Sequence, residues 1–304
     1  MSKLITEQEV LSLSEIQNAP PIDVPQVQFF TSHDLTPLAY YHFATRQKPV
    51  ANVLLIHGGG AHSKAGYQHV AHALREKFNI SVYLLDLRGH GQSGGNKGDT
   101  PSVEHVWQDV QCFVNRMKQR EDTPMYLCGH SSGAGLILNY LSWAECELDG
   151  YFFIAPEFGY KSNTAKNDIP RRFATIKLWK FIVSSMTGGR WFGNSPAVFF
   201  NYPQAALKED PLIITSISVQ MSLSMTPYAP QKQFQSIRKK YGLFVGEQDE
   251  LYNVEQVAGY HNLSQTGIRL QSVCKVIEDK NHLSILLTVG TDIGEIIYRW
   301  QGLK

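Results

Sequence analysis

Apolar residues occur along this chain in two kinds of pattern. Short unbroken runs predict strands buried on both faces, and stretches with an apolar residue every three or four positions predict amphipathic helices. From residue 51 onward the two patterns alternate, which predicts a parallel sheet with helices on both faces. The predicted strands are residues 51–56, 80–87, 125–128 and 151–155, and the predicted helices are centred on residues 67–77, 103–117 and 136–141.

A hairpin pattern precedes this alternation. Two β-rich segments, residues 27–31 and 38–44, are joined by the polar residues 32–36. Several prolines lie just before the hairpin, so we interpret residues 1–26 as an N-terminal extension. The extension lacks a basic, then apolar, then small-residue pattern, and a signal peptide is therefore not expected.

The alternation is interrupted after residue 156. Residues 157–229 are aromatic and rich in Asn, Ser and Pro, and they predict a helical cap inserted between late strands of one sheet. The pattern then resumes with two strands and a final helix, at residues 241–246, 268–277 and 283–300. We therefore expect an α/β core, formed by residues 27–156 and 230–304, that carries the cap.

Composition narrows the class of protein. The chain has 304 residues, of which 43% are hydrophobic and 18% charged, and this excludes a disordered or fibrous protein. Its net charge of +1 argues against a nucleic-acid partner. No apolar run approaches the roughly 18 residues of a membrane span. We expect free thiols in a reducing, cytoplasmic compartment, because no C-x-x-C pair occurs among Cys112, Cys128, Cys146 and Cys274.

The strongest local motif lies at residues 129–133. They read GHSSG and fit the pattern G-x-S-x-G between a predicted strand and a predicted helix. A serine at the tip of such a turn projects its hydroxyl from the sheet, and the flanking glycines relieve crowding. Ser131 is therefore the candidate nucleophile. Ser132 lies off the centre of the motif, and we expect its side chain to pack sideways.

A serine nucleophile needs a base, and the base needs a partner that fixes its tautomer. In this topology the acid follows the serine along the chain and the histidine follows the acid. Asp249 comes directly after the strand at 241–246, and His282 lies between the last strand and the final helix. We assign these two residues as acid and base. The neighbouring Glu247 and Glu250 are interpreted as solvated loop carboxylates.

An oxyanion hole is the third requirement of this chemistry. The glycines at 58–60 follow the strand at 51–56, and they leave room for backbone N–H groups to approach a developing negative charge. The N–H groups of Gly59 and Ser132 are the expected donors. We expect His62 and His130, which flank the site in sequence, to line the substrate pocket.

These motifs resemble those of the α/β hydrolases of the monoacylglycerol lipase and lysophospholipase type, which are sometimes grouped with serine aminopeptidases. Residues 57–63 read HGGGAHS, similar to that family's H-G-x-G-E-H-S, and residues 86–95 read DLRGHGQSGG, similar to D-x-R-G-H-G-x-S-G-G. Residues 210–212 read DPL, like the family's motif late in the cap. The resemblance covers residues 27–300. It implies an α/β-hydrolase fold and hydrolysis of a lipid-like carboxylic ester without a cofactor, and we expect no metal.

The chain departs from the family's pattern at three positions. Ala61 stands where Glu is usual, Ala134 replaces a glycine after the serine, and Leu283 follows the candidate base where Glu is common. No member of the triad is lost, so the departures concern the substrate more than the reaction. Within the loop at 86–95 we interpret Arg88 as an anchor of the turn through its fixed donors.

The sequence of the cap indicates the class of substrate. It is net basic, and apolar residues between 176 and 186 predict a helix that opens at Pro170. Trp179 lies on the apolar side of this helix, which we interpret as the cover of an acyl pocket. The helix could also rest on an anionic lipid surface, because Lys177 and Lys180 lie opposite or beside the apolar stripe. One lid can serve both purposes.

The expected reaction is hydrolysis of monoacylglycerol- or lysophospholipid-type esters through an acyl-enzyme. Three alternatives stay open on the sequence alone. An amidase or aminopeptidase would use the same triad, but it would need an acidic group for the substrate ammonium, and the cap is net basic. An acyltransferase would pass the acyl group to an alcohol other than water. A non-catalytic binding module would keep only the fold.

Overall fold

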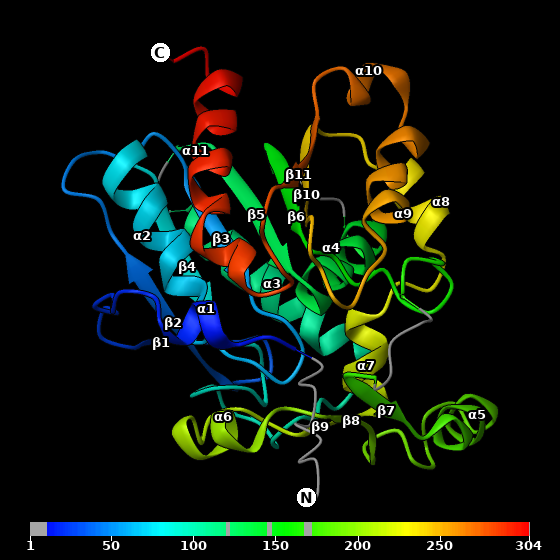
Figure 1. The fold of residues 1–304 in the computed structure, drawn as a ribbon. Helices are drawn as coiled ribbons and strands as arrows, with labels where there is room; N and C mark the ends of the chain where they lie inside the picture. The colour runs from blue at the N-terminus through cyan, green and yellow to red at the C-terminus, as the bar shows by residue number, and fades with distance from the viewer. Residues whose placement is uncertain (1–10, 120–121, 145–147, 167–171, 304) are drawn as a thin grey trace, which may run out of the picture.

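The computed structural model describes residues 11–119, 122–144, 148–166 and 172–303. They form an eight-stranded sheet with helices on both faces and a smaller cap, which lies below the sheet in Figure 1. The sheet has the order β1-β2-β4-β3-β5-β6-β10-β11, and only β2 pairs antiparallel with its neighbours. The predicted, mostly parallel α/β sheet is confirmed. Its strands are β1 (Gln28–Thr31), β2 (Pro37–Phe43), β3 (Asn52–Ile56), β4 (Ser81–Leu85), β5 (Met125–His130), β6 (Gly150–Ile154), β10 (Tyr241–Gly246) and β11 (Val273–Ile277).

The helices bury the two faces of the sheet in two separate apolar clusters. One face is covered by α2 (Tyr67–Phe78) and α11 (Val289–Trp300), whose residues Val70 and Ile293 are fully buried against strand residues. The other face is covered by α3 (Val103–Lys118) and α4 (Ser132–Trp143). Each such side chain contributes roughly 1.5–3 kcal/mol on burial. The shorter helices are α1 (Ser14–Gln17), α8 (Pro230–Gln235), α9 (Val254–Gly259), α10 (Thr266–Arg269), η1 (Tyr260–Leu263) and η2 (Ser284–Leu287).

The predicted hairpin is confirmed by β1 and β2, in which Phe30 lies opposite Leu38. The last predicted strand is wrong in its first half. Thr266–Arg269 forms the helical turn α10, and β11 begins only at Val273. Leu270, which extended the apolar run in the sequence, is 81% exposed and adds nothing to the core.

The cap contains a second sheet as well as helices, so the expectation of a helical cap was incomplete. Three short antiparallel strands are joined in the order β7-β8-β9. The helix that was expected to open at Pro170 begins at Leu178 instead, because the β-branched Thr175 and Ile176 pair with β8 as part of β7. Pro170 itself lies outside the described residues. The cap elements are β7 (Ala174–Ile176), α5 (Leu178–Met186), β8 (Pro196–Phe200), α6 (Gln204–Glu209), β9 (Ser216–Ser218) and α7 (Val219–Met225).

Two further expectations concern membrane-spanning helices and the state of the cysteines. Within the described ranges, no helix has both the length and the apolar character needed to cross a bilayer. Cys112, Cys128 and Cys274 are free thiols, and only Cys128 is fully buried. Cys146 lies outside the described residues.

Candidate active site

Ser131 occupies the sharp turn between β5 and α4. Its backbone has φ 54° and ψ −124°, in a region that residues with a side chain rarely adopt. A Cβ atom at Gly129 would lie 2.5 Å from the carbonyl oxygen of Gly133, and one at Gly133 would lie 2.5 Å from the carbonyl oxygen of His57. Glycine is therefore required on both sides, and the turn holds the serine hydroxyl above the sheet.

The structure brings the three predicted triad residues together from three different strand ends. His282 Nε2 lies 3.1 Å from Ser131 Oγ, and His282 Nδ1 lies 2.9 Å from Asp249 Oδ2. The second oxygen of Asp249 accepts hydrogen bonds from the backbone N–H groups of residues 251 and 252, each at 2.9 Å. Since an ionised carboxylate only accepts, the proton of the neutral imidazole is on Nδ1. The lone pair of Nε2 then faces the serine hydroxyl.

Burial and charge act in opposite directions on the acid and the base. Burial alone raises the pKa of Asp249, but the charge of His282 and the hydrogen bonds to the carboxylate outweigh it, and the pKa is lowered. Burial alone lowers the pKa of His282, but the charge and hydrogen bond of Asp249 outweigh it, and the pKa is raised. The pair therefore favours an ionised acid beside a base that gains a proton readily.

The expected oxyanion donors are Gly59, in the loop after β3, and Ser132, at the start of α4. A Cβ atom at Gly59 would lie 3.0 Å from Ser132 Oγ, so the loop after β3 directly faces the first residue of α4. Tyr202 from the cap donates a hydrogen bond to the carbonyl oxygen of Gly59 at 3.0 Å, which fixes this peptide. The N–H of Ser132 is at the start of a helix, where backbone donors have no intrahelical acceptor. Both N–H groups are thus available to a substrate oxygen.

His130 is a buried link between the two halves of the site. The Tyr67 hydroxyl accepts a hydrogen bond from the Gly58 N–H at 2.7 Å and lies 2.9 Å from His130 Nδ1. His130 Nε2 donates to the carbonyl oxygen of His282 at 2.9 Å. Burial lowers the pKa of His130 to about 3, so the ring is neutral and this tautomer fits both contacts. His130 borders the cavity, as expected, but most of its ring is enclosed by protein.

Two expected pocket residues do not line the cavity. His62 is buried and its Nε2 donates to Asp210 Oδ2 at 2.6 Å, because the Lys64 N–H occupies the other ring nitrogen. His62 therefore ties the oxyanion loop to the DPL motif of the cap. Trp179 is 51% exposed and packs edge-on against Phe192, so it faces away from the site.

Ser131 opens into a large cavity between the core and the cap. The cavity has a volume of about 1430 Å³, and its border includes Ser131, His282 and both oxyanion loops. Much of its wall is apolar and comes from the cap, with Phe173, Ile176, Leu178, Phe181, Ile182, Phe200 and Met225. The arrangement places the candidate nucleophile and the candidate base at the side of a space that is large enough for a long apolar chain.

Sequence reasoning missed three residues of the site. Glu250 is not a solvated carboxylate: one of its oxygens accepts from the His282 backbone N–H at 2.9 Å. Glu157 follows β6 and lines the cavity, and burial raises its pKa. Tyr252 also lines the cavity and packs on the ring of His282. The position of Glu157 three residues after the end of β6 is a signal that could have identified it.

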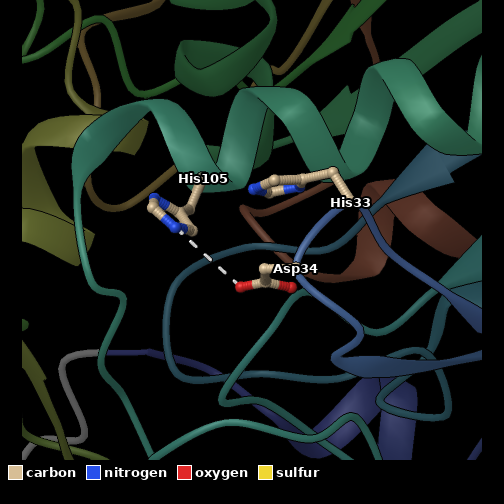
Figure 2. Close-up of side chains that lie close together, drawn as sticks. All are labelled: His33, Asp34 and His105. Atoms are coloured by element: carbon tan, nitrogen blue, oxygen red, sulfur yellow. Dashed lines mark ion pairs between the residues drawn. The ribbon is translucent and has the colours of Figure 1, made fainter.

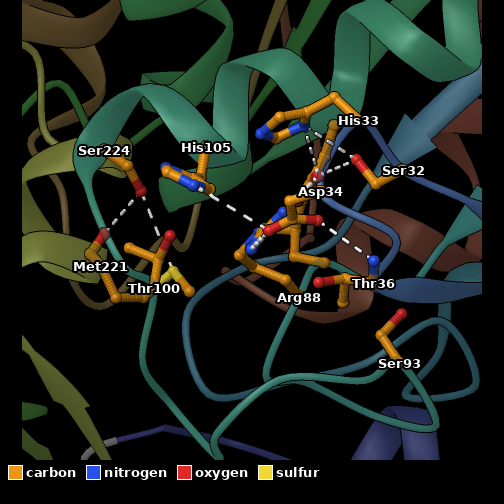
Figure 3. Close-up of polar contacts among 12 residues, drawn as sticks. Ser32, His33, Asp34, Thr36, Arg88, Ser93, Thr100, His105, Met221 and Ser224 are labelled. Carbon is orange, nitrogen blue, oxygen red and sulfur yellow. Dashed lines mark hydrogen bonds and ion pairs between the residues drawn. The ribbon is translucent and has the colours of Figure 1, made fainter.

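A second group of titratable side chains lies outside the site. His33, Asp34 and His105 have their potential ligand atoms within 4.8 Å of one another (Figure 2). However, Asp34 already accepts a hydrogen bond from the Arg88 guanidinium at 2.8 Å (Figure 3). Arg88 is buried and forms two further bonds with Asp109, each at 2.6 Å. This positive charge opposes a cation, and we interpret the group as the ion-pair network through which Arg88 anchors its loop.

Comparisons with known proteins are consistent with this geometry. A family model described as serine aminopeptidase, S33, matches residues 47–282. A putative monoglyceride lipase of Schizosaccharomyces pombe is 33% identical over 189 residues, which cover 59% of this chain and 48% of that protein. The monoglyceride lipase of Mus musculus is 27% identical over 175 residues, covering 57% of this chain and 55% of the mouse protein. The chain thus spans about half the length of these curated relatives.

The fold has close counterparts among solved structures. A soluble variant of monoglyceride lipase from Saccharomyces cerevisiae, solved with a substrate analog, superposes with a TM-score of 0.72 and covers 93% of this chain and 99% of its own. At 17% identity this likeness establishes the α/β-hydrolase fold alone. The family model, by contrast, spans most of the chain, from before β3 to the candidate base His282. The chain therefore belongs to the serine aminopeptidase S33 family of α/β hydrolases.

Proposed function

We propose that this chain is a serine hydrolase that cleaves carboxylic esters through an acyl-enzyme. The observation that carries the proposal is the hydrogen-bonded chain from Asp249 through His282 to Ser131, which ends at the wall of a large cavity. The monoglyceride lipases among its relatives favour an ester as the bond that is cleaved.

The proposed mechanism uses only groups of the chain and water. His282 Nε2 takes the Ser131 proton while Oγ attacks the ester carbonyl carbon, and Asp249 stabilises the imidazolium. The N–H groups of Gly59 and Ser132 stabilise the tetrahedral oxyanion. His282 then gives its proton to the departing alcohol, which leaves the acyl group on Ser131. Water, deprotonated by His282, attacks this acyl-enzyme, and the acid product leaves as Ser131 regains its proton.

The cavity favours a substrate with a long apolar chain, of the monoacylglycerol or lysophospholipid type. Its volume of about 1430 Å³ exceeds what a short-chain ester needs, and the cap side chains that border it are mainly apolar and aromatic. A panel of p-nitrophenyl esters from acetate to palmitate tests this. We expect kcat/KM to rise with chain length, and a maximum at acetate would contradict the assignment.

The main alternative is an amidase or aminopeptidase with the same triad. One observation favours it: Glu157 places a carboxyl group in the cavity wall, where it could hold a substrate ammonium. Against it, burial raises the pKa of Glu157 and so disfavours the charged form. Hydrolysis of a monoacylglycerol and of an aminoacyl anilide should be compared directly, and measured transfer to added alcohol separates hydrolysis from acyl transfer.

We further propose that the cap docks on a lipid surface. The region around α5 exposes large apolar side chains to an unusual degree, including Leu178 (65%), Trp179 (51%), Met186 (81%) and Trp191 (66%). Lys177 and Lys180 lie at the start of the same helix. Apolar side chains that insert into a bilayer, beside cations that pair with anionic headgroups, are the features of a peripheral membrane site. Leu178 also lines the cavity, so docking would bring the lipid next to the cavity border.

A cytoplasmic location is also a proposal. It is supported by the free thiols of Cys112, Cys128 and Cys274, which are typical of a reducing compartment. Detection of the protein in fractionated cells tests it, and recovery from an oxidising compartment would contradict it.

A further inference from the structure

The N-terminal segment, which we define as residues 11–18, enters the active-site cavity. Leu11, Leu13, Ile16 and Gln17 all border the cavity, and Leu11 is only 2% exposed. In Figure 1, α1, which belongs to this segment, lies above α6 and on the opposite side of the view from α5. The segment precedes residue 47, where the match to the family model begins.

The segment is attached both to the cap and to the loop that carries His282. Gln17 Nε2 donates to Glu209 Oε2 of α6 at 3.1 Å. Glu15 pairs with Lys280, two residues before the candidate base, at 2.8 Å. Ile16 packs into the space left by the missing side chain of Gly66, where a Cβ atom would lie 2.6 Å from it. These contacts come from separate parts of the fold and fix the segment in one position.

Glu250 connects the segment to the candidate base. Its Oε1 accepts a hydrogen bond from the Ser12 backbone N–H at 2.9 Å, and its Oε2 accepts from the His282 backbone N–H at 2.9 Å. A carboxylate that receives two N–H donors forms stronger bonds than a neutral acceptor would. One side chain therefore holds the N-terminal segment and the backbone of the base in a fixed relation.

We propose that the N-terminal segment contributes to the active site in two ways. Leu13 forms part of the cavity wall against which the apolar chain of a long-chain ester packs. Glu250, which the segment contacts through Ser12, is a positioning residue for His282. The proposal rests on the ester hydrolase function proposed above. It extends that function by assigning chain-length specificity to residues that precede the part of the chain matched by the family model.

The wall is tested with p-nitrophenyl decanoate and p-nitrophenyl acetate. Leu13→Asp places a charge against the chain, and we expect the decanoate/acetate ratio of kcat/KM to fall about tenfold, since burying an unpaired charge against an apolar group is costly. Leu13→Met keeps the apolar volume, so its decanoate/acetate ratio should stay within about threefold of the wild-type ratio. If Leu13→Asp does not fold, Leu13→Ala gives the same test with a fall of about threefold. Leu270→Asp, at an exposed leucine far from the cavity border, is the matched control.

The positioning role is tested with Glu250→Gln. An amide has only one acceptor oxygen, so one of the two backbone N–H groups loses its partner. We expect kcat on both esters to fall about tenfold through misplacement of His282, with little change in KM. Glu255→Gln, at an exposed carboxylate on α9, is the matched control and should keep the wild-type kcat.

The outcomes separate this inference from the proposed function. A wild-type protein that hydrolyses neither ester would contradict the function itself. A wild-type protein that hydrolyses both, with an unchanged ratio in the Leu13 variants, would overturn the wall. A folded Glu250→Gln variant with wild-type kcat would overturn the positioning role.

Discussion

The side chain of His130 donates a hydrogen bond to the backbone carbonyl oxygen of His282 at 2.9 Å, and the two rings lie with centroids 4.9 Å apart. Through Tyr67, the other nitrogen of His130 is connected to the N–H of Gly58 in the oxyanion loop. A continuous chain of hydrogen bonds thus joins the loop that carries Gly58 and Gly59 to the loop that carries the candidate base His282.

This chain predicts the effect of Tyr67→Phe. The change leaves the Gly58 N–H and His130 Nδ1 buried without their partner, at a cost of roughly 1–3 kcal/mol in the free energy of unfolding. We also expect kcat/KM to fall about tenfold, because both loops lose a positioning contact. Urea unfolding and ester kinetics measure the two effects. Tyr228→Phe, at a tyrosine that is 60% exposed, is the control, and wild-type kcat/KM in Tyr67→Phe would contradict the prediction.

The raised pKa of His282 predicts the pH dependence of the reaction. The base must be neutral to accept the Ser131 proton, so activity is lost as pH falls through its pKa, which lies above the ordinary value of 6.5. Asp249→Asn removes the charge that raises this pKa. The acidic limb of kcat/KM should therefore move to lower pH, while kcat falls by up to about 10⁴ because the tautomer is no longer fixed. A limb that stays in place would be inconsistent with the charge effect.

The backbone of Ser131 predicts a trade between activity and stability. At φ 54° a side chain is strained, by about 1–3 kcal/mol, and only glycine relieves the strain. The free energy of unfolding, measured with urea, should therefore be higher for Ser131→Gly than for Ser131→Ala. We expect a difference of about 1 kcal/mol, after subtracting the larger conformational entropy that glycine gives the unfolded chain. Both variants lack the nucleophile. Equal stability would show that the turn is not strained.

The exposed apolar side chains of α5 predict binding to anionic vesicles. Replacing Trp179 and Met186 together by Ser removes two inserting groups, each worth roughly 1.5–3 kcal/mol when buried. We expect binding to phosphatidylserine-containing vesicles in a sedimentation assay to fall at least about tenfold. Leu270→Ser, at an exposed apolar residue outside the cap, should bind like the wild type. Unchanged binding of the double variant would place the contact elsewhere.

The sequence predicted the parts of the site that depend on local chain order. Ser131, Asp249 and His282 each follow a strand of the parallel part of the sheet, and parallel strands place their carboxyl ends at one edge of the sheet. Arg88 was also interpreted correctly as an anchor, because three of its fixed donors bind the carboxylates of Asp34 and Asp109.

The parts that could not be predicted depend on contacts between residues far apart in the chain. Glu250 gains its role from Ser12, which no local pattern connects to it. Trp179 was expected at the pocket because it shares a helical stripe with Ile182, yet a stripe does not show which side of α5 meets the core. Short elements such as β7 have too few residues to show the alternation of apolar and polar positions that identifies a strand.

Covalent labelling of Ser131 by a fluorophosphonate tests the central claim most directly. These probes react with a serine that an adjacent base activates, and fragment mass spectrometry locates the adduct. We predict one adduct, on Ser131, with loss of both labelling and ester hydrolysis in Ser131→Ala, while Ser132→Ala, which keeps its backbone N–H, still reacts. An adduct on another residue, or ester hydrolysis that survives in Ser131→Ala, would contradict the account.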